Sequence, residues 1–221
     1  MDNYKITFET WNKVASLYED KFMNLDLYND SYDLFCKLIN KKDAHILEIG
    51  CGPGNITKYI VSSRPDFKIQ AIDVAPNMIK LARINNPTVE YKVMDCRLIK
   101  MISEKFDGII CGFCIPYLSA EDSSKLITDC YHLLNNNGLF YFSTIKGDYK
   151  LSGFEKGSTG DEAYVYYYNE DHFKKELIKN GFILIELLQK DFPKTDGTIL
   201  INQIFIAQKN KDHQDLPLNF F

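Results

Sequence analysis

The stretch ILEIGCGPGN, from Ile46 to Asn55, decides the fold of this 221-residue chain. In it an apolar run, interrupted by Glu48, leads into three glycines and a proline between Gly50 and Gly54. This order predicts a strand, a tight turn and a helix that begins near Asn55. Such a turn places backbone N–H groups and the positive end of a helix against a ligand. We therefore predict a binding loop for a molecule with an anionic or strongly polar end.

A second acidic residue narrows the kind of ligand. Asp73 ends the β-rich run KIQAID, 19 residues after Gly54, and a carboxylate there can accept hydrogen bonds from both hydroxyls of a ribose. The loop and the acid together predict an adenosine-bearing ligand at the carboxyl edge of a sheet. Asn55 stands where the dinucleotide fingerprint has glycine or alanine, which counts against NAD, and no Gly-Lys-Ser/Thr follows as a P-loop requires.

After this region, short β-rich runs alternate with longer amphipathic segments, a pattern typical of βαβ units and a parallel sheet. The predicted strands are residues 45–50, 68–73, 89–94, 106–111, 138–144, 182–188 and 199–208. Only QKDFPKTDGT separates the last two, and a connection that short cannot cross over, so the seventh strand must run antiparallel to the sixth. The predicted fold is therefore α/β, a doubly wound, mostly parallel sheet of seven strands with an antiparallel seventh strand.

We expect one domain over residues 1–221, because the chain is long enough for one core but not for two full-sized folds. Helical spacing of apolar residues between Phe8 and Ile39 predicts two helices in an N-terminal helical cap, residues 1–40, ahead of a core at 42–208.

Two further segments carry their own expectations. The glycine-containing segment 146–168 is predicted to be an inserted lid or edge segment. In it the alternating Tyr164, Tyr166 and Tyr168 predict an extra edge strand with one aromatic face toward the ligand, or else a cover for the sheet edge. Residues 209–221 are expected to be a frayed tail or, alternatively, a docking peptide.

Composition limits the partners. A net charge of −4 with intermixed charges argues against nucleic acid. The N-terminal segment has no apolar core of the signal-peptide type, and no stretch reaches the roughly 18 apolar residues of a membrane helix, so we expect a cytoplasmic protein without a membrane partner. The six scattered cysteines predict reduced, buried thiols. Cys111 and Cys114 form a lone CxxC, and without a second pair or a Cys/His cluster we expect no metal.

The chain resembles the class I S-adenosylmethionine-dependent methyltransferases. The first motif of that family reads roughly E/D-x-G-x-G-x-G, and it stands here as Glu48, Gly50, Gly52 and Gly54. The resemblance continues in order through AIDVAPNMIKLAR, VMDC, FDGIICGFCIPYL and LLNNNGLFYFST into the sixth and seventh strands, covering about residues 42–208. It implies a Rossmann-like methyltransferase fold and S-adenosyl-L-methionine as the cofactor.

The resemblance also implies roles by position. The backbone of Gly50, Cys51 and Gly52 would lie along the methionine part of the cofactor, in a loop that Glu48 organises from behind. Asp73 would hold the ribose hydroxyls.

Further along the chain, Val74 and Met78 would pack on the adenine. Asp95 would accept the adenine amino group, and the Cys96 amide would donate to a ring nitrogen. Cys111 would lie where the backbone lines the reactive sulfonium.

The sequence gives fewer signals for the residues that would contact the methyl acceptor. By analogy with the family, Tyr18 and Tyr117 would flank the acceptor, although packing is an alternative role for both. None of the four histidines is placed to act as a base, so the catalytic residues stay unknown. The segment CIPY, which ends at Tyr117, resembles the Asn/Asp-Pro-Pro-Tyr box of nucleobase-methylating enzymes. It lacks the amide or acid of that box, which argues against DNA amino-nitrogen methylation.

The expected function is direct in-line methyl transfer to an unidentified small-molecule acceptor by a monomer or homodimer. A protein or RNA methyltransferase is the alternative, and a non-catalytic cofactor-binding module is the second. A dehydrogenase is a remote further possibility.

Overall fold

The computed structural model describes residues 2–157, 159–194 and 197–211. Within these residues the main sheet has seven strands in the order β3-β2-β1-β4-β5-β9-β8. The strands are β1 (His45–Ile49), β2 (Lys68–Asp73), β3 (Glu90–Val93), β4 (Phe106–Cys111), β5 (Leu134–Ile145), β8 (Phe182–Pro193) and β9 (Ile199–Lys209). Strands β1 to β5 are mutually parallel, and β9 pairs antiparallel with both β5 and β8. The predicted sheet and its antiparallel seventh strand are confirmed.

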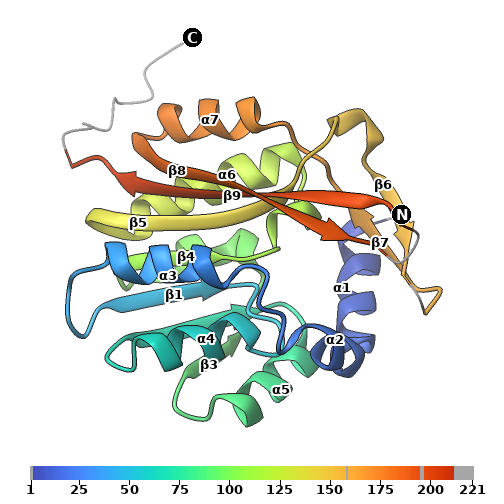
Figure 1. Ribbon diagram of the computed structural model, residues 1–221, viewed down its shortest axis with the longest axis horizontal. Coiled ribbons are helices and arrows are strands. Elements are labelled where there is room, and N and C mark those ends of the chain that lie inside the picture. The colour runs from blue at the N-terminus through green and yellow to red at the C-terminus, as the bar shows by residue number, and fades with distance from the viewer. Residues whose placement is uncertain (1, 158, 195–196, 212–221) are drawn as a thin grey trace.

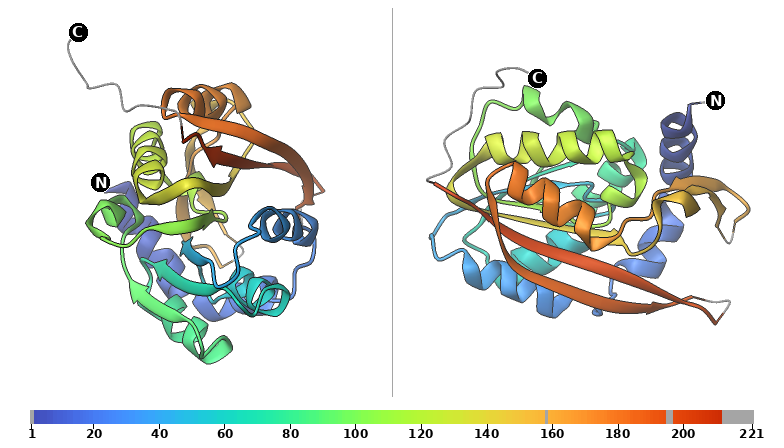
Figure 2. Two further views of the ribbon diagram at one scale, coloured as in Figure 1. Left: turned by 90° about the vertical axis from the view of Figure 1, so that its left-hand side faces the viewer. Right: turned by 90° about the horizontal axis from the view of Figure 1, so that it is seen from above.

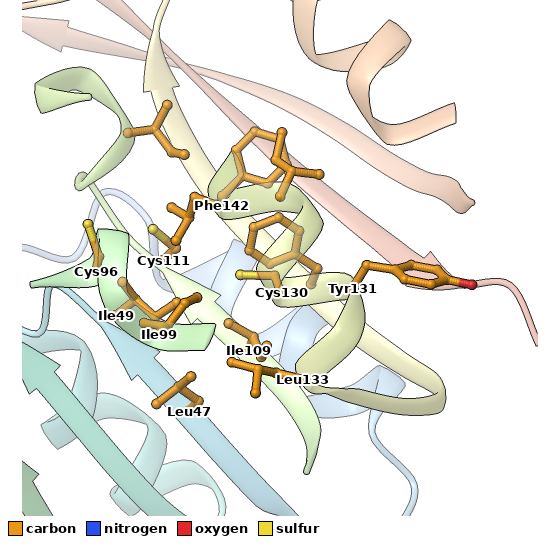
Figure 3. Packing of buried hydrophobic residues seen from close by; sticks show 14 of the residues in the cluster. Leu47, Ile49, Cys96, Ile99, Ile109, Cys111, Cys130, Tyr131, Leu133 and Phe142 are labelled. Atoms are coloured by element: carbon orange, nitrogen blue, oxygen red, sulfur yellow. The ribbon is translucent and has the colours of Figure 1, made fainter. Parts of the chain in front are cut away.

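Helices cover both faces of the sheet (Figure 1, Figure 2). One face packs against α3 (Asn29–Leu38), α4 (Asn55–Ser63) and α5 (Pro76–Asn85), and the other against α6 (Ala120–Leu133), α7 (Glu170–Lys179) and the short helix η1 (Cys96–Met101). Side chains alternate between the two faces along each strand. The buried side chains therefore form two core clusters. The first lies on the face of α3, α4 and α5 and contains Ile46, and the second lies on the face of α6, α7 and η1 and contains Leu47. Figure 3 shows Leu47, Ile109 and Phe142 gathered in that second cluster.

Local sequence signals begin the helices. Pro76 is the first residue of α5, where its missing N–H costs no helical hydrogen bond. Ser119 accepts a hydrogen bond from the Asp122 amide at the start of α6 (3.2 Å), and Asn169 accepts one from the His172 amide at the start of α7 (3.0 Å). Serine and asparagine are favoured at such N-cap positions, because the side-chain oxygen accepts a hydrogen bond from an amide of the first helical turn.

The N-terminal segment differs from its prediction. It forms three helices before the glycine turn, α1 (Asn3–Lys13), α2 (Ala15–Phe22) and α3, and not two. Val14 leaves the helical conformation (φ −92°, ψ 13°) and separates α1 from α2. The break lets these helices cover the end of the sheet toward which β1 points (Figure 1). Asn12 fastens them to α5, because it accepts from the Asn77 amide (2.8 Å) and its carbonyl accepts from the Asn77 side chain (2.9 Å).

The predicted extra edge strand is wrong. Strands β6 (Gly153–Lys156) and β7 (Glu162–Val165) pair with each other as a separate hairpin and not with an edge of the main sheet. The hairpin instead docks on α1: the Thr10 hydroxyl donates to the Glu162 carbonyl (2.7 Å), and the Tyr164 amide donates to Thr7 Oγ1 (3.0 Å). Beyond the hairpin, Tyr168 forms a single bridge to the end of β5: its amide donates to the Ile145 carbonyl (3.0 Å), and its carbonyl accepts from the Gly147 amide (3.0 Å).

Other boundaries also shift. Strand β5 begins at Leu134, four residues before the predicted start, and passes through an irregular register next to Asn137, whose φ is 61°. Two short helices, η2 (Ile115–Tyr117) and η3 (Tyr149–Leu151), follow β4 and β5. Strand β9 continues to Lys209, and the expected tail lies outside the described residues from 212 onward.

Candidate functional site

The glycine turn after β1 needs its glycines for two different reasons. Gly50, Gly52 and Gly54 all have positive φ angles, +69°, +55° and +87°, which side-chain-bearing residues rarely adopt. A Cβ on Gly50 would lie 2.9 Å from the Cys114 Cβ, and one on Gly54 would lie 2.5 Å from Asn86 Nδ2. A Cβ on Gly52 would have its nearest neighbour, a ring carbon of Tyr18, 3.7 Å away. Close packing within the protein therefore requires two of the glycines, and only Gly52 leaves room beside the backbone.

The amides of this turn are used inside the protein. Gly50 and Cys51 both donate to the Ile72 carbonyl (2.8 and 3.0 Å), and Gly52 donates to Asp73 Oδ2 (2.9 Å). The prediction that the turn presents free N–H groups to a ligand does not hold for these three residues. They tie the turn to the end of β2, because parallel strands bring their carboxyl ends to one edge of the sheet.

Asp73 is held in place from two sides. Its Oδ2 accepts from Gly52 and its Oδ1 accepts from the Ala75 amide (2.8 Å). Burial raises the pKa of Asp73, while the amide hydrogen bonds oppose that shift. A carboxylate oxygen has two lone pairs, so each oxygen can still accept one more hydrogen bond.

A pocket, here called the central pocket, lies between this turn and helices α1 and α2. It contains seven of the eleven residues predicted for the cofactor: Gly50, Gly52, Asp73, Val74, Met78, Asp95 and Cys96. The other four, Glu48, Cys51, Gly54 and Cys111, do not line it. Cys51 and Cys111 are buried in the two core clusters, and Gly54 is the N-cap of α4.

Glu48 lies behind the turn, 1% exposed. Its Oε2 accepts from the Thr57 hydroxyl (2.6 Å), whereas Oε1 has no hydrogen-bond partner within the described residues. Burial raises the pKa of Glu48 to about 8, and the charge of Asp73 adds to the shift. Burial therefore favours the protonated form of this side chain.

Asp95 is already engaged. The Arg97 Nε lies 3.0 and 2.9 Å from its two oxygens, and Arg97 also donates Nη2 to Oδ2 (2.5 Å). The guanidinium stacks over the Tyr4 ring of α1 at 4.0 Å. Sequence reasoning missed Arg97, because the signal depends on α1 lying across this edge of the sheet.

The central pocket also contains residues that the sequence did not predict: Phe8, Trp11, Met94, Gly112, Phe113, Cys114 and Leu118. The helical spacing of Phe8 and Trp11 was a usable signal for α1. Phe113 gave no sequence signal, because a left-handed backbone (φ +58°) is not expected at a non-glycine residue. Its amide donates to Ser143 Oγ (2.8 Å). Strained backbone of this kind is concentrated at functional sites.

The two predicted acceptor residues, Tyr18 and Tyr117, do lie in the central pocket. Trp11 stands between them, with its ring centroid 5.7 Å from Tyr18 and 5.1 Å from Tyr117. Burial raises the pKa of both tyrosines, so neither supplies a phenolate. The buried Trp11 Nε1 has no acceptor among the described residues. The described histidines, His45, His132 and His172, do not line the pocket.

Two further pockets meet the central pocket at these three aromatic residues. The aromatic slot lies between α2, the start of α3 and the β8–β9 hairpin. The hairpin pocket lies between α1, α2 and the β6–β7 hairpin and has four charged residues, Lys21, Glu155, Lys156 and Asp161. The tyrosines expected to face the ligand do not line any of the three pockets; Tyr168 is 1% exposed and donates to the Leu118 carbonyl (2.6 Å).

The cysteines are free thiols, as predicted, and five of the six are buried. Cys114 is half-buried, and its Sγ lies 3.6 Å from that of Cys96 at the wall of the central pocket. Figure 3 shows Cys96, Cys111 and Cys130 among apolar side chains. Over the described ranges, no three or more His, Cys, Asp or Glu side chains come together as a metal site would require. No helix in that part of the chain has the length and apolar character to span a bilayer.

Comparison with known proteins gives a consistent match. A family model described as a methyltransferase domain matches residues 46–138. The putative methyltransferase 235L of Invertebrate iridescent virus 6 is 31% identical over 118 residues, covering 53% of this chain and 43% of that protein. The malonyl-[acyl-carrier protein] O-methyltransferase of Acetivibrio thermocellus is 32% identical over 109 residues, covering 48% of this chain and 38% of that protein. The chain thus spans less than half the length of these two relatives.

Solved structures extend the match to the whole fold. The magnesium protoporphyrin IX methyltransferase of Synechocystis PCC 6803, solved with bound S-adenosylhomocysteine, aligns with a TM-score of 0.72 at 14% identity. The alignment covers 95% of this chain and all of that chain. At this identity the likeness establishes the fold.

Proposed function

We propose that this chain is a class I S-adenosylmethionine-dependent methyltransferase, as the match of residues 46–138 to a methyltransferase domain supports, and that it transfers a methyl group from S-adenosylmethionine to a small-molecule acceptor. The observation that carries the proposal is the convergence of Gly52, Asp73 and Asp95 on one pocket at the carboxyl edge of the sheet. Gly52 has the open side there, and Asp73 keeps lone pairs free beside it. These features fit a ligand with an adenosine part.

Each wall of the central pocket has a proposed part in holding the cofactor. Asp73 accepts from the ribose hydroxyls, and Val74 and Met78 pack against the adenine. The backbone at Gly50 and Gly52 runs beside the methionine end.

At the far side of the adenine, the Cys96 amide donates to a ring nitrogen. Asp95, whose two oxygens already accept from the Arg97 amide and guanidinium, accepts from the amino group in exchange for one of these contacts. Glu48, Cys51, Gly54 and Cys111 act from behind the pocket, by shaping the turn and the end of β4.

The reaction itself asks little acid–base chemistry of the protein. When bound, S-adenosylmethionine would supply a methyl group already activated by its positive sulfur. The residues at the pocket junction then have to orient the acceptor and exclude water. In this proposal both tasks fall to Trp11, Tyr18 and Tyr117, whose rings pack together in the central pocket. The roof made by α1 and α2 favours a small acceptor over a protein or an RNA, which would need an open surface.

The direct test is calorimetric titration of the protein with S-adenosylmethionine and S-adenosylhomocysteine. We expect Asp73→Asn to weaken binding by about 10- to 150-fold, as the loss of a charged hydrogen-bond acceptor worth about 1.5–3 kcal/mol predicts. Asp171→Asn, an exposed acid on α7, is the matched control and should bind like the wild type. Absence of heat with either ligand on the wild-type protein would reject the proposal.

A further inference from the structure

We propose, on the basis of the proposed function, that the acceptor site is the aromatic slot and that it takes a neutral, planar heteroaromatic molecule. The slot shares Trp11, Tyr18, Phe113 and Tyr117 with the central pocket. A molecule in the slot would therefore lie directly beside the cofactor.

The walls of the slot select flat, apolar molecules. Eight of its twelve lining residues are aromatic, including Phe22, Tyr32 and Phe192, and none is charged. Its cavity volume is about 150 Å³. Aromatic rings pack well against such faces in offset or edge-to-face geometry. Phe113 and Tyr28 already form such an edge contact, with centroids 4.7 Å apart.

One hydrogen-bonded pair of polar side chains would orient a ligand in the slot. The Tyr28 hydroxyl accepts a hydrogen bond from Asn202 Nδ2 (2.8 Å), and the two residues are only 4% and 5% exposed. Because the hydroxyl oxygen is used as an acceptor, its own proton remains free to donate. Burial raises the pKa of Tyr28 to about 12, so this proton stays in place at physiological pH. A ligand atom that accepts a hydrogen bond fits here.

The slot has no charged lining residue, and this limits the kind of atom that could accept the methyl group there. No carboxylate or imidazole lines the slot, and the junction tyrosines stay protonated, so the protein offers no base there. An anionic acceptor would find no cation in the slot. The acceptor must bring a lone pair that needs no deprotonation, as a heteroaromatic nitrogen does. The hairpin pocket, with two lysines and two acids, is the competing site and suits a charged molecule instead.

Trp11 allows the test to be made in solution, because it is the single tryptophan of the chain and lies at the pocket junction. The probes are isoquinoline, neutral at mildly alkaline pH, and 2-naphthoate, an anion with the same two-ring outline. Saturating S-adenosylhomocysteine keeps either probe out of the central pocket. We expect isoquinoline to quench Trp11 fluorescence saturably and 2-naphthoate to bind at least tenfold more weakly.

Variants assign the binding to the slot. Tyr28→Phe keeps the ring and removes the donor, and should weaken isoquinoline binding about tenfold. Phe192→Ala opens a wall without burying an unpaired polar group and should weaken it too. Tyr59→Phe, outside all three pockets, and Lys156→Gln, in the hairpin pocket, should leave it unchanged.

Tighter binding of 2-naphthoate, or isoquinoline binding that responds to Lys156→Gln and not to Tyr28→Phe, would overturn this assignment. The calorimetric titration keeps the two proposals apart. If S-adenosylhomocysteine binds and isoquinoline does not, the slot assignment is wrong and the proposed function stands.

Discussion

At the scale of single residues, the glycine turn separates two demands that the sequence presents together. Gly54 packs against the Asn86 side chain and the backbone of Ala82, so its lack of a side chain serves the protein interior. Gly52 faces the ring of Tyr18 across open space. One motif thus contains one glycine required by packing and one that keeps the pocket accessible.

This difference predicts that alanine at Gly54 mainly affects stability, whereas alanine at Gly52 mainly affects ligand binding. Gly54→Ala should lower the free energy of unfolding by about 2–4 kcal/mol, because left-handed strain and overpacking add together. Gly52→Ala should lower it by about 1 kcal/mol. Gly52→Ala should also weaken the binding of S-adenosylhomocysteine at least tenfold, since the new methyl group enters the central pocket. Urea unfolding and calorimetry measure the two effects. Unchanged affinity in Gly52→Ala would contradict the assignment.

At the scale of elements, α1 joins parts of the chain that are far apart in sequence. The Ser119 amide at the start of α6 donates to the Tyr4 hydroxyl (2.9 Å), and Tyr4 in turn donates to Asp122. At the same helix, Thr7 and Thr10 bind the β6–β7 hairpin. The roof of the central pocket and the hairpin are therefore one connected layer.

Thr7→Val tests this connection, because it removes the acceptor of the half-buried Tyr164 amide while keeping the shape of the side chain. An unpaired buried amide costs about 1–3 kcal/mol. We expect faster hydrogen exchange in Gly153–Lys156, Glu162–Val165 and α1, measured by mass spectrometry, with α6 and α7 unchanged. Thr128→Val, which loses a hydrogen bond to Asn180 on the far helices, is the control and should leave the hairpin protected. Equal exchange of the hairpin in both variants would count against the docking argument.

At the scale of the whole molecule, a buried acid links folding to pH. The pKa of Glu48 rises from 4.5 to about 8 on folding, mainly through burial. The folded state therefore keeps a proton that the unfolded chain releases between these two values. Stability from this group is fully present below about pH 4.5 and is lost as the pH rises toward 8.

Glu48→Gln should remove this dependence while keeping an oxygen for the Thr57 hydroxyl. In urea unfolding of the unliganded protein, the variant should gain stability relative to the wild type from pH 5 to pH 8, by up to a few kcal/mol. Glu9→Gln, on the exposed face of α1, should parallel the wild type. Parallel curves for Glu48→Gln and the wild type would show that the carboxyl ionises at its ordinary pKa.

By itself the sequence determined the seven strands, their mostly parallel arrangement and the antiparallel last strand. It also placed seven of the predicted cofactor residues at one pocket. These features follow from local signals, since the period of the apolar residues reports which face of an element is buried and the length of a connection limits the direction of the next strand.

Only the tertiary structure decided what covers each element. The break at Val14, the hydrogen bond from Thr10 to Glu162 across 152 residues, and the left-handed Phe113 have no local signature. They arise because buried polar groups must find partners wherever the chain brings them together. The hydrogen bonds by which the amides of the glycine turn donate to the end of β2 follow from the same requirement.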